Sequence, residues 1–131
     1  MATRSYIGIL LPNDNIKFVY CHHDGYPTGV GKTLVEYYNR ESMIEALLDM
    51  GSISSLGPDI GLRNDFNNRD ARFCLFYRRD RGEKDSGINI ASDEIEFLNH
   101  DGVDYHYLFD DGKWRCFDRG EEIDLYRELD L

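Results

Sequence analysis

The chain has 131 residues, of which 41% are hydrophobic and 13% aromatic, which is enough for one hydrophobic core but not for two. No apolar run approaches the roughly 18 residues of a membrane-spanning helix and no leader-like segment opens the chain, so we expect one domain over residues 1–131, in the cytoplasm and not in a membrane. The formal net charge of −10 disfavours a broad nucleic-acid surface, because such a surface needs clustered Lys and Arg.

The first elements predicted are a β-hairpin and a helix. Residues 5–11 and 16–22 are apolar, β-favouring runs, and the Pro-Asn-Asp-Asn sequence at 12–15 between them has the composition of a turn. A glycine-rich segment, 22–32, follows the second strand. A helix is then predicted over 32–38.

A second helix is predicted to begin at Ser42. Ser42 and Glu45 have the spacing of a capping box, which makes Ser42 the expected N-cap, and Gly51 provides a C-terminal stop. The region 51–70 contains glycine, proline and asparagine and lacks periodicity. It is therefore predicted to be a loop.

The second half of the chain predicts a strand, a hairpin and two helices. Residues 71–79 are continuously apolar around their centre, which is typical of a central strand covered on both faces. A short helix is predicted from Ser92 through Leu98. Strands at 105–109 and 114–117 flank an Asp-Gly turn, and 121–129 is predicted to close the chain as a helix. The fold class expected is α+β, with one mainly antiparallel sheet of about five strands and three or four helices on one side.

The most unusual segment begins at His22, because three glycines within seven residues need a backbone reason such as the close approach of a ligand. The end of this segment, Gly31-Lys32-Thr33, is also the ending of a phosphate-binding P-loop. However, Tyr26 occupies the position where that motif needs its first glycine, and Gly25 is one residue too far away. We therefore interpret the segment as a binding loop and not as a P-loop.

An anion-binding pocket is predicted if the strands at 16–22 and 71–79 are parallel neighbours, since the loops after both strands would then meet at one sheet edge. Lys and Arg would bind phosphate, Tyr26 could stack on a base, and N–H groups between the glycines could form an anion-binding nest. The alternative is that these residues only form turns and exposed salt bridges. The candidate ligand-binding residues are His22, Asp24, Gly25, Tyr26, Gly29, Gly31, Lys32, Arg78, Arg79 and Arg81.

No metal site, cofactor or catalytic centre is predicted. Cys21, Cys74 and Cys116 lie far apart in apolar runs, which is typical of reduced core thiols, and the chain has no Cys-x-x-Cys pair. No recognisable nucleophile with an adjacent base is present. The enzymatic alternative is a small hydrolase that uses His22 and Asp24 as an acid–base pair.

The charge is distributed unevenly along the chain. Residues 1–60 carry 4 basic and 7 acidic groups, residues 61–85 carry 7 and 5, and residues 86–131 carry 4 and 13, giving −3, +2 and −9. The simplest explanation of a strongly negative net charge is that it keeps the protein soluble. The charge also permits a second hypothesis, in which the acidic C-terminal part imitates DNA and occupies a host nuclease or a CRISPR-type effector.

Four sequence blocks follow one another over most of the chain. They are His22-x-Asp24-Gly25-Tyr26-Pro27-x-Gly29-Val30-Gly31, Ile53-Ser54-Ser55-Leu56-Gly57, Arg79-Asp80-Arg81-Gly82-Glu83 and Tyr105-x-Tyr107-Leu108-Phe109. In this order they resemble the blocks of a family of short bacteriophage and prophage proteins. The resemblance implies a phage accessory protein of the anti-defence kind, and it identifies no catalytic residues. We expect stoichiometric binding of either a nucleotide-type immune signal or a host defence protein, and the chain is compatible with a homo-oligomer.

Overall fold

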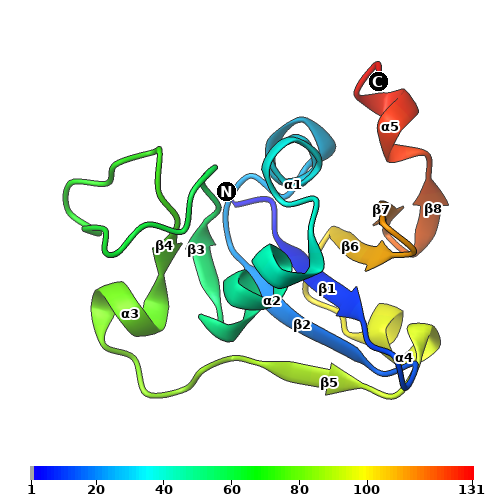
Figure 1. Cartoon of the computed structure of the whole chain (residues 1–131), viewed down its shortest axis with the longest axis horizontal. Coiled ribbons are helices and arrows are strands. Elements are labelled where there is room, and N and C mark those ends of the chain that lie inside the picture. The colour runs from blue at the N-terminus through cyan, green and yellow to red at the C-terminus, as the bar shows by residue number, and fades with distance from the viewer. Residues whose placement is uncertain (1) are drawn as a thin grey trace.

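A computed structural model describes residues 2–131, which form a mixed sheet with helices against both of its faces (Figure 1). The strands lie in the order β4-β3-β2-β1-β6-β7-β8, and β5 pairs with the other end of β2. They are β1 (Ser5–Leu10), β2 (Ile16–Cys21), β3 (Ile53–Ser55), β4 (Leu75–Phe76), β5 (Asn89–Ala91), β6 (Tyr105–Asp110), β7 (Lys113–Asp118) and β8 (Glu121–Ile123). The helical elements are η1 (Pro27–Gly31, a π-helical turn), α1 (Lys32–Tyr37), α2 (Glu41–Asp49), α3 (Tyr77–Arg81), α4 (Glu94–Asn99) and α5 (Leu125–Glu128).

Both predicted hairpins are present, and the α+β class is confirmed with more strands than the five expected. β1 and β2 pair antiparallel, as do β6 and β7. Asp111 and Gly112 connect β6 to β7 with φ of 51° and 76°, the left-handed pair that a tight hairpin turn needs. Parallel pairing of β1 with β6 joins the two hairpins into one sheet. β2 also pairs in parallel with β3, and the remaining pairings are antiparallel.

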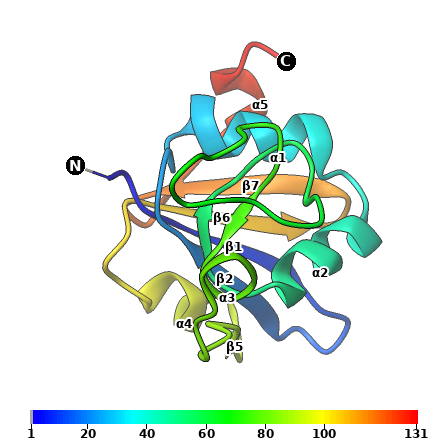
Figure 2. The ribbon, with the colours of Figure 1, turned by 90° about the vertical axis from the view of Figure 1, so that its left-hand side faces the viewer.

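Helices cover both faces of the sheet, so the expectation that they lie on one side is wrong. Val19 of β2 belongs to the core beneath α1 and α2, together with Leu34 and Ile44. Its neighbour Phe18 points to the opposite face and packs edge-on against Phe97 of α4, with ring centroids 5.1 Å apart. Figure 2 shows α4 on the side of the sheet away from α1. Consecutive apolar residues on one strand face opposite ways, and each face then needs a cover.

The segment 71–79 is not a central strand. Only β4 is extended there, and it lies at the sheet edge beside β3, which was predicted to be loop. The chain turns into α3 directly after β4 because the Asp80 carboxylate accepts a hydrogen bond from the N–H of Phe76, and Gly82 ends the helix with φ of 73°. Hydrogen bonds to residues that are distant in the sequence stabilise this turn.

Two further local predictions are corrected. α2 begins at Glu41 after an extended Arg40, so Ser42 lies inside the helix and the proposed capping box does not form. The expected closing helix over 121–129 is divided, because Arg119 and Gly120 form a second tight turn that pairs β8 with β7. Only α5 is helical there, with the Asp124 side chain as its N-cap. Among residues 2–131, no helix has the length and apolar content needed to cross a membrane.

Candidate functional site

The glycine-rich segment 22–32 is closed by hydrogen bonds to its own backbone. The N–H of Val30 donates to the carbonyl of Asp24 at 2.8 Å, and the N–H of Gly29 donates to the carbonyl of Tyr26 at 2.9 Å. The N–H of Gly25 donates to Thr3, outside the segment. Because these donors already have protein acceptors, they do not form the anion-binding nest that the sequence suggested.

Internal packing explains the glycines of this segment. A Cβ added at Gly29 would lie 2.3 Å from the carbonyl oxygen of Asp24, and one at Gly25 would lie 2.9 Å from that of Thr3. At Gly31 the added Cβ would lie 2.9 Å from a methyl of Leu125 in α5. Backbone contacts therefore require glycine at positions 25 and 29, whereas the contact at Gly31 is with the end of a side chain, which can shift.

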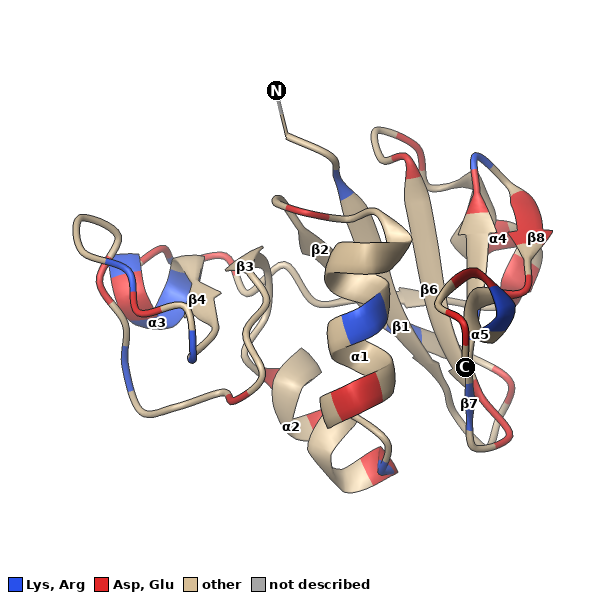
Figure 3. Ribbon diagram, turned by 90° about the horizontal axis from the view of Figure 1, so that it is seen from above, with Lys and Arg blue, Asp and Glu red and all other residues tan. Residues whose placement is uncertain are grey.

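The two predicted loops are not brought together by neighbouring parallel strands, because β3 lies between β2 and β4. Lys32 begins α1 and forms a loose ion pair with Glu36 one turn later, with Nζ and Oε1 3.8 Å apart. Tyr26 is 40% exposed and donates a hydrogen bond to Asp24, which raises the pKa of Tyr26. In Figure 3, α1 lies over the sheet, whereas α3 lies at one end of the molecule among several Lys and Arg residues.

The three arginines of α3 have different environments. Arg79 donates to Asp80 and to the carbonyls of Ile60, Gly61 and Cys74, so that all five guanidinium N–H groups have acceptors. This geometry assigns Arg79 to structure, because no N–H remains for a ligand. Arg78 is exposed.

Arg81 lies over the neighbouring rings of Phe66 and Tyr77, with its guanidinium carbon 4.8 Å from each ring centroid and the two centroids 5.7 Å apart. It also pairs with Glu83. The three side chains form a cation–π stack at the surface. This stack connects α3 to the loop that precedes β4.

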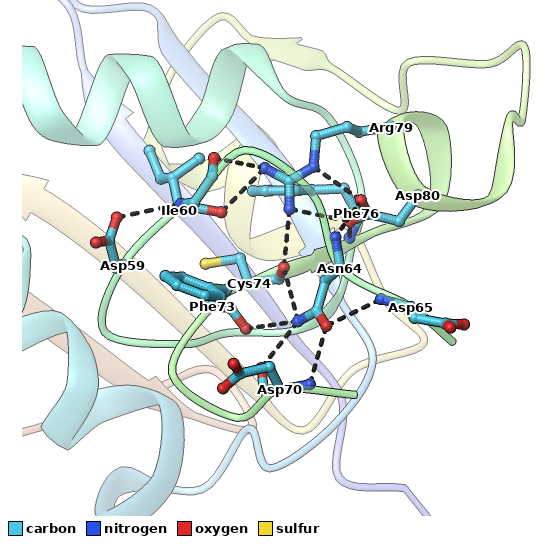
Figure 4. A network of polar contacts seen from close by, with 11 residues as sticks. Asp59, Ile60, Asn64, Asp65, Asp70, Phe73, Cys74, Phe76, Arg79 and Asp80 are labelled. Atoms are coloured by element: carbon cyan, nitrogen blue, oxygen red, sulfur yellow. Dashed lines mark hydrogen bonds and ion pairs between the residues drawn. The ribbon is translucent and has the colours of Figure 1, made fainter. Parts of the chain in front are cut away.

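That loop, residues 59–74, is fixed by a partly buried polar network (Figure 4). The side-chain amide of Asn64 donates to the carbonyls of Asp70, Phe73 and Cys74, at 2.9, 3.1 and 3.4 Å, and its oxygen accepts the N–H of Asp70. Asp80 accepts the N–H of Asn64 at 2.8 Å. A long loop without regular structure therefore has one defined conformation.

Asp80 is the centre of this network. Its side chain is 1% exposed and that of its partner Arg79 is 14% exposed. Burial alone would raise the pKa of Asp80, but the hydrogen bonds from Arg79 and from the N–H groups of Phe76 and Asn64 hold that pKa below its usual range. The carboxylate stays charged, and the pair fixes the loop to α3.

One side of this loop forms the wall of a polar cavity of about 350 Å³, which we call the Arg69 groove. The floor is the end of β3, where Ser54 and Ser55 are each 4% exposed. The groove is lined by His23, Asp24, Ser54, Ser55, Phe66, Arg69 and Leu75. Beyond the Arg81 stack lies a second cavity of about 340 Å³, lined by Tyr20, Ser52, Tyr77, Arg81, Glu83, Asp85 and Gly87.

The lining of the Arg69 groove contains one cation, Arg69, and one carboxylate, Asp24. Arg69 is exposed and forms no ion pair within residues 2–131. Next to the groove, Nδ1 of His22 and the hydroxyl of Tyr20 lie 2.6 Å apart. Partial burial, His23 and the positive charge of Arg4 together lower the pKa of His22. The Arg69 guanidinium and the hydroxyls of Ser54 and Ser55 can donate to phosphate oxygens, and the Phe66 ring offers an apolar surface beside them.

Two of the ten predicted ligand-binding residues line these cavities, Asp24 in the first and Arg81 in the second. Sequence reasoning missed the serines of β3 and the residues of the loop, Phe66 and Arg69. The serines lie in one of the family-like blocks, and that was the available indication. Arg69 lies in a polar stretch with no periodicity and had none.

The groove does not contain an assembled catalytic triad. His23, Asp24, Ser54 and Ser55 line one cavity, yet within residues 2–131 no side-chain hydrogen bond joins a serine to a histidine there or a histidine to Asp24. No group of three or more His, Cys, Asp or Glu in that same range could hold a metal ion. The three cysteines are buried and free, and burial raises the pKa of Cys21 to about 12.

Comparison with known proteins gave no matching family model and no match to a curated protein or to a solved structure. The resemblance to short phage proteins therefore stays a prediction from four sequence blocks.

Proposed function

We propose that the protein binds a small anionic ligand of nucleotide type in the Arg69 groove and acts by sequestering it. The observation that carries this proposal is an arginine without an ion pair among residues 2–131, beside an aromatic ring and two serines, on a loop fixed by a partly buried network. A loop that is already ordered loses little conformational entropy when it binds. The binding free energy is therefore not reduced by a cost of ordering the loop.

Each part of the groove has a role in this proposal. The Arg69 guanidinium binds phosphate oxygens through paired N–H groups, and the hydroxyls of Ser54 and Ser55 donate to the same anion or to a sugar. Phe66 contacts the face of a base. A cavity of about 350 Å³ is near the lower end of the range usual for small-ligand sites, which favours a mononucleotide-sized group.

The phage-like sequence blocks supply the biological context. A phage accessory protein that binds a host immune signal in the bacterial cytoplasm would blunt defence without catalysis. The competing partner within this class is a host defence protein, which would contact the same loop. A ligand screen separates the two.

The test is a thermal-shift screen with AMP, ADP, cyclic AMP, cyclic dinucleotides and ADP-ribose, followed by a check that each compound is chemically intact. A ligand at a hundred times its Kd stabilises the fold by about 2.7 kcal/mol, which raises the Tm of a domain of this size by roughly 10 °C. An intact ligand with such a shift supports sequestration. A converted ligand supports a hydrolase based on the histidine, Asp24 and serines of the groove, and no shift with any compound contradicts the proposal.

A matched pair of variants locates the site. Arg69→Gln removes the cation of the groove, whereas Arg63→Gln removes an exposed cation of the same loop that does not line this groove. Loss of the ligand shift in Arg69→Gln alone assigns binding to the groove. Equal shifts in both variants would place the ligand elsewhere.

The DNA-mimic hypothesis has one supporting observation, the acidic residues that gather around β8 and in the C-terminal part of the chain (Figure 3). Part of this charge is already neutralised, because Arg115 pairs with Glu94, Asp110 and Glu122. The hypothesis predicts binding to a nuclease-type enzyme that weakens steeply with salt and is lost when Asp111 and Glu121 are changed to Asn and Gln together. Retention in that variant would remove the hypothesis.

A further inference from the structure

The opposite side of the loop 59–74 exposes an apolar side chain at a fixed position. Leu62 is 95% exposed, the largest exposure among the large hydrophobic residues described. The loop cannot withdraw it easily, because Asn64, two residues later, is bound through its N–H to Asp80 and through its amide to three carbonyls. A single exposed leucine is ordinary on a protein surface, but a fixed backbone keeps this one in place beside an apolar groove, so that binding would order little.

An apolar groove lies next to this leucine. It runs between the end of α1, the outer side of α2 and the start of the loop, with a volume of about 570 Å³, and we call it the Met43 groove. It is lined by Tyr37, Tyr38, Ser42, Met43, Ala46, Pro58, Asp59 and Ile60. A second cavity of about 620 Å³ shares Asp59 and Ile60 and continues to Leu62, Arg63 and Phe73. Because Asp59 and Ile60 line both cavities, Leu62 lies close to the Met43 groove.

We infer that two copies of this chain pair across this face about a two-fold axis, with Leu62 of each copy inserted into the Met43 groove of the other. A two-fold contact needs a surface complementary to itself, and an apolar projection beside an apolar groove meets that condition. In the dimer, each Leu62 side chain is buried in an apolar groove. No other exposed large hydrophobic residue lies in the lining of either cavity except Tyr37, which belongs to the groove.

The charges agree with this arrangement. Asp59 is the only charged residue lining the Met43 groove, and Arg63, next to Leu62, forms no ion pair within residues 2–131. When Leu62 enters the groove of the second copy, Arg63 follows it and approaches Asp59 of that copy. Opposite charges at the rim of an apolar contact fix its register more than they add affinity.

This inference does not depend on the proposed ligand. Phe66 and Arg69 line the other side of the loop, so the pairing leaves both Arg69 grooves open. The contact is modest in extent, and interfaces of that kind are weak and concentration-dependent. The dimer is therefore expected only at high protein concentration.

The experiment is sedimentation equilibrium of the whole chain from about 10 µM to about 1 mM at low and at moderate salt. The wild-type mass is expected to rise from 15.3 kDa towards twice that value. Leu62→Ser should stay monomeric, whereas Ile95→Ser, which removes an exposed isoleucine on α4, should dimerise like the wild type. Arg63→Glu should weaken the dimer, because it places like charges together.

Two results would overturn the inference. One is a wild type that stays monomeric over the whole concentration range. The other is a Leu62→Ser variant that dimerises like the wild type. All three variants replace exposed side chains and leave the core intact, and circular dichroism spectra check that they fold.

Discussion

The glycine-rich segment 22–32 and the loop 59–74 show opposite relations between sequence pattern and structure. The first has the most conspicuous motif of the chain, and its N–H groups and glycines are used by the protein itself. The second has no motif, yet a buried Asp80–Arg79 pair holds it and it presents Arg69, Phe66 and Leu62 to solvent. The many glycines of segment 22–32 thus indicate tight packing within the protein. In the loop 59–74, exposed side chains on a fixed backbone indicate binding.

The largest effect is expected from Asp80→Ala, which separates the loop from α3. The change leaves the Arg79 guanidinium buried without its carboxylate and removes the acceptor for the N–H groups of Phe76 and Asn64. Breaking a buried pair from one side costs about 3–5 kcal/mol of unfolding free energy. Urea unfolding measures it.

Glu36→Ala is the matched control, because Glu36 forms only an exposed pair with Lys32 in the other region. Such pairs are worth less than about 1 kcal/mol. If Asp80→Ala cost no more than this control, the loop would not be held by its network and the comparison would fail.

A smaller effect is expected from Gly29→Ala in the glycine-rich segment. The new methyl meets the carbonyl oxygen of Asp24, and forcing a carbon into such a contact costs about 1–3 kcal/mol. Thr28→Ala, an exposed change in the same turn, should alter the unfolding free energy by less than about 0.5 kcal/mol. Nucleotide binding should survive Thr28→Ala. Loss of binding in Thr28→Ala with unchanged stability would return the site to this segment.

Acid should also distinguish the two regions. The pKa of Asp80 in the folded protein lies below its ordinary value of 3.8, so the stability that its charge contributes is complete above that value and is lost as the pH falls through the folded pKa. The NMR amide signals of Asn64 and Phe76 should move first as the pH is lowered from about 5 to about 2.

The amides of Gly29 and Val30 provide the internal control for this titration. Their acceptors are backbone carbonyls, which do not titrate in this range. Simultaneous loss of all four signals would show that acid unfolds the protein as a whole and that Asp80 does not act locally.

The smallest effect on stability is expected from Arg69→Gln. The side chain is exposed and unpaired in the described chain, so the unfolding free energy should change by less than about 0.5 kcal/mol. Ligand affinity should nevertheless be lost, and titration calorimetry measures it. A variant that binds as tightly as the wild type would remove Arg69 from the site.

Much of the fold was predictable because its determinants are local. Both hairpins follow from apolar, β-favouring runs around turn residues, and the observed boundaries agree with the prediction within one residue for α1 and within two for α4. The predictions that failed depend on contacts between residues that are far apart in the sequence. Arg79 binds the carbonyls of Ile60 and Gly61, almost twenty positions earlier, and those bonds help to make α3 where the sequence favoured a strand.

The candidate site was less predictable for the same reason. The tight packing at Gly31 is against Leu125, at the other end of the chain, and no local pattern reveals it. Arg69 and Ser54 meet only after β3 pairs with β2 and the loop folds over them. Residue types near a turn can suggest a pocket, whereas only the tertiary structure shows which side chains remain available.

The most direct test of the central claim is an amide NMR titration with the nucleotide of the screening panel that gives the largest thermal shift. The account predicts that the shift changes fall on His23 and Asp24, on Ser54 and Ser55, and on Phe66 to Arg69, while Gly29 to Lys32 stay unchanged. Changes confined to Gly29 to Lys32, or no change with any nucleotide of the panel, would contradict it.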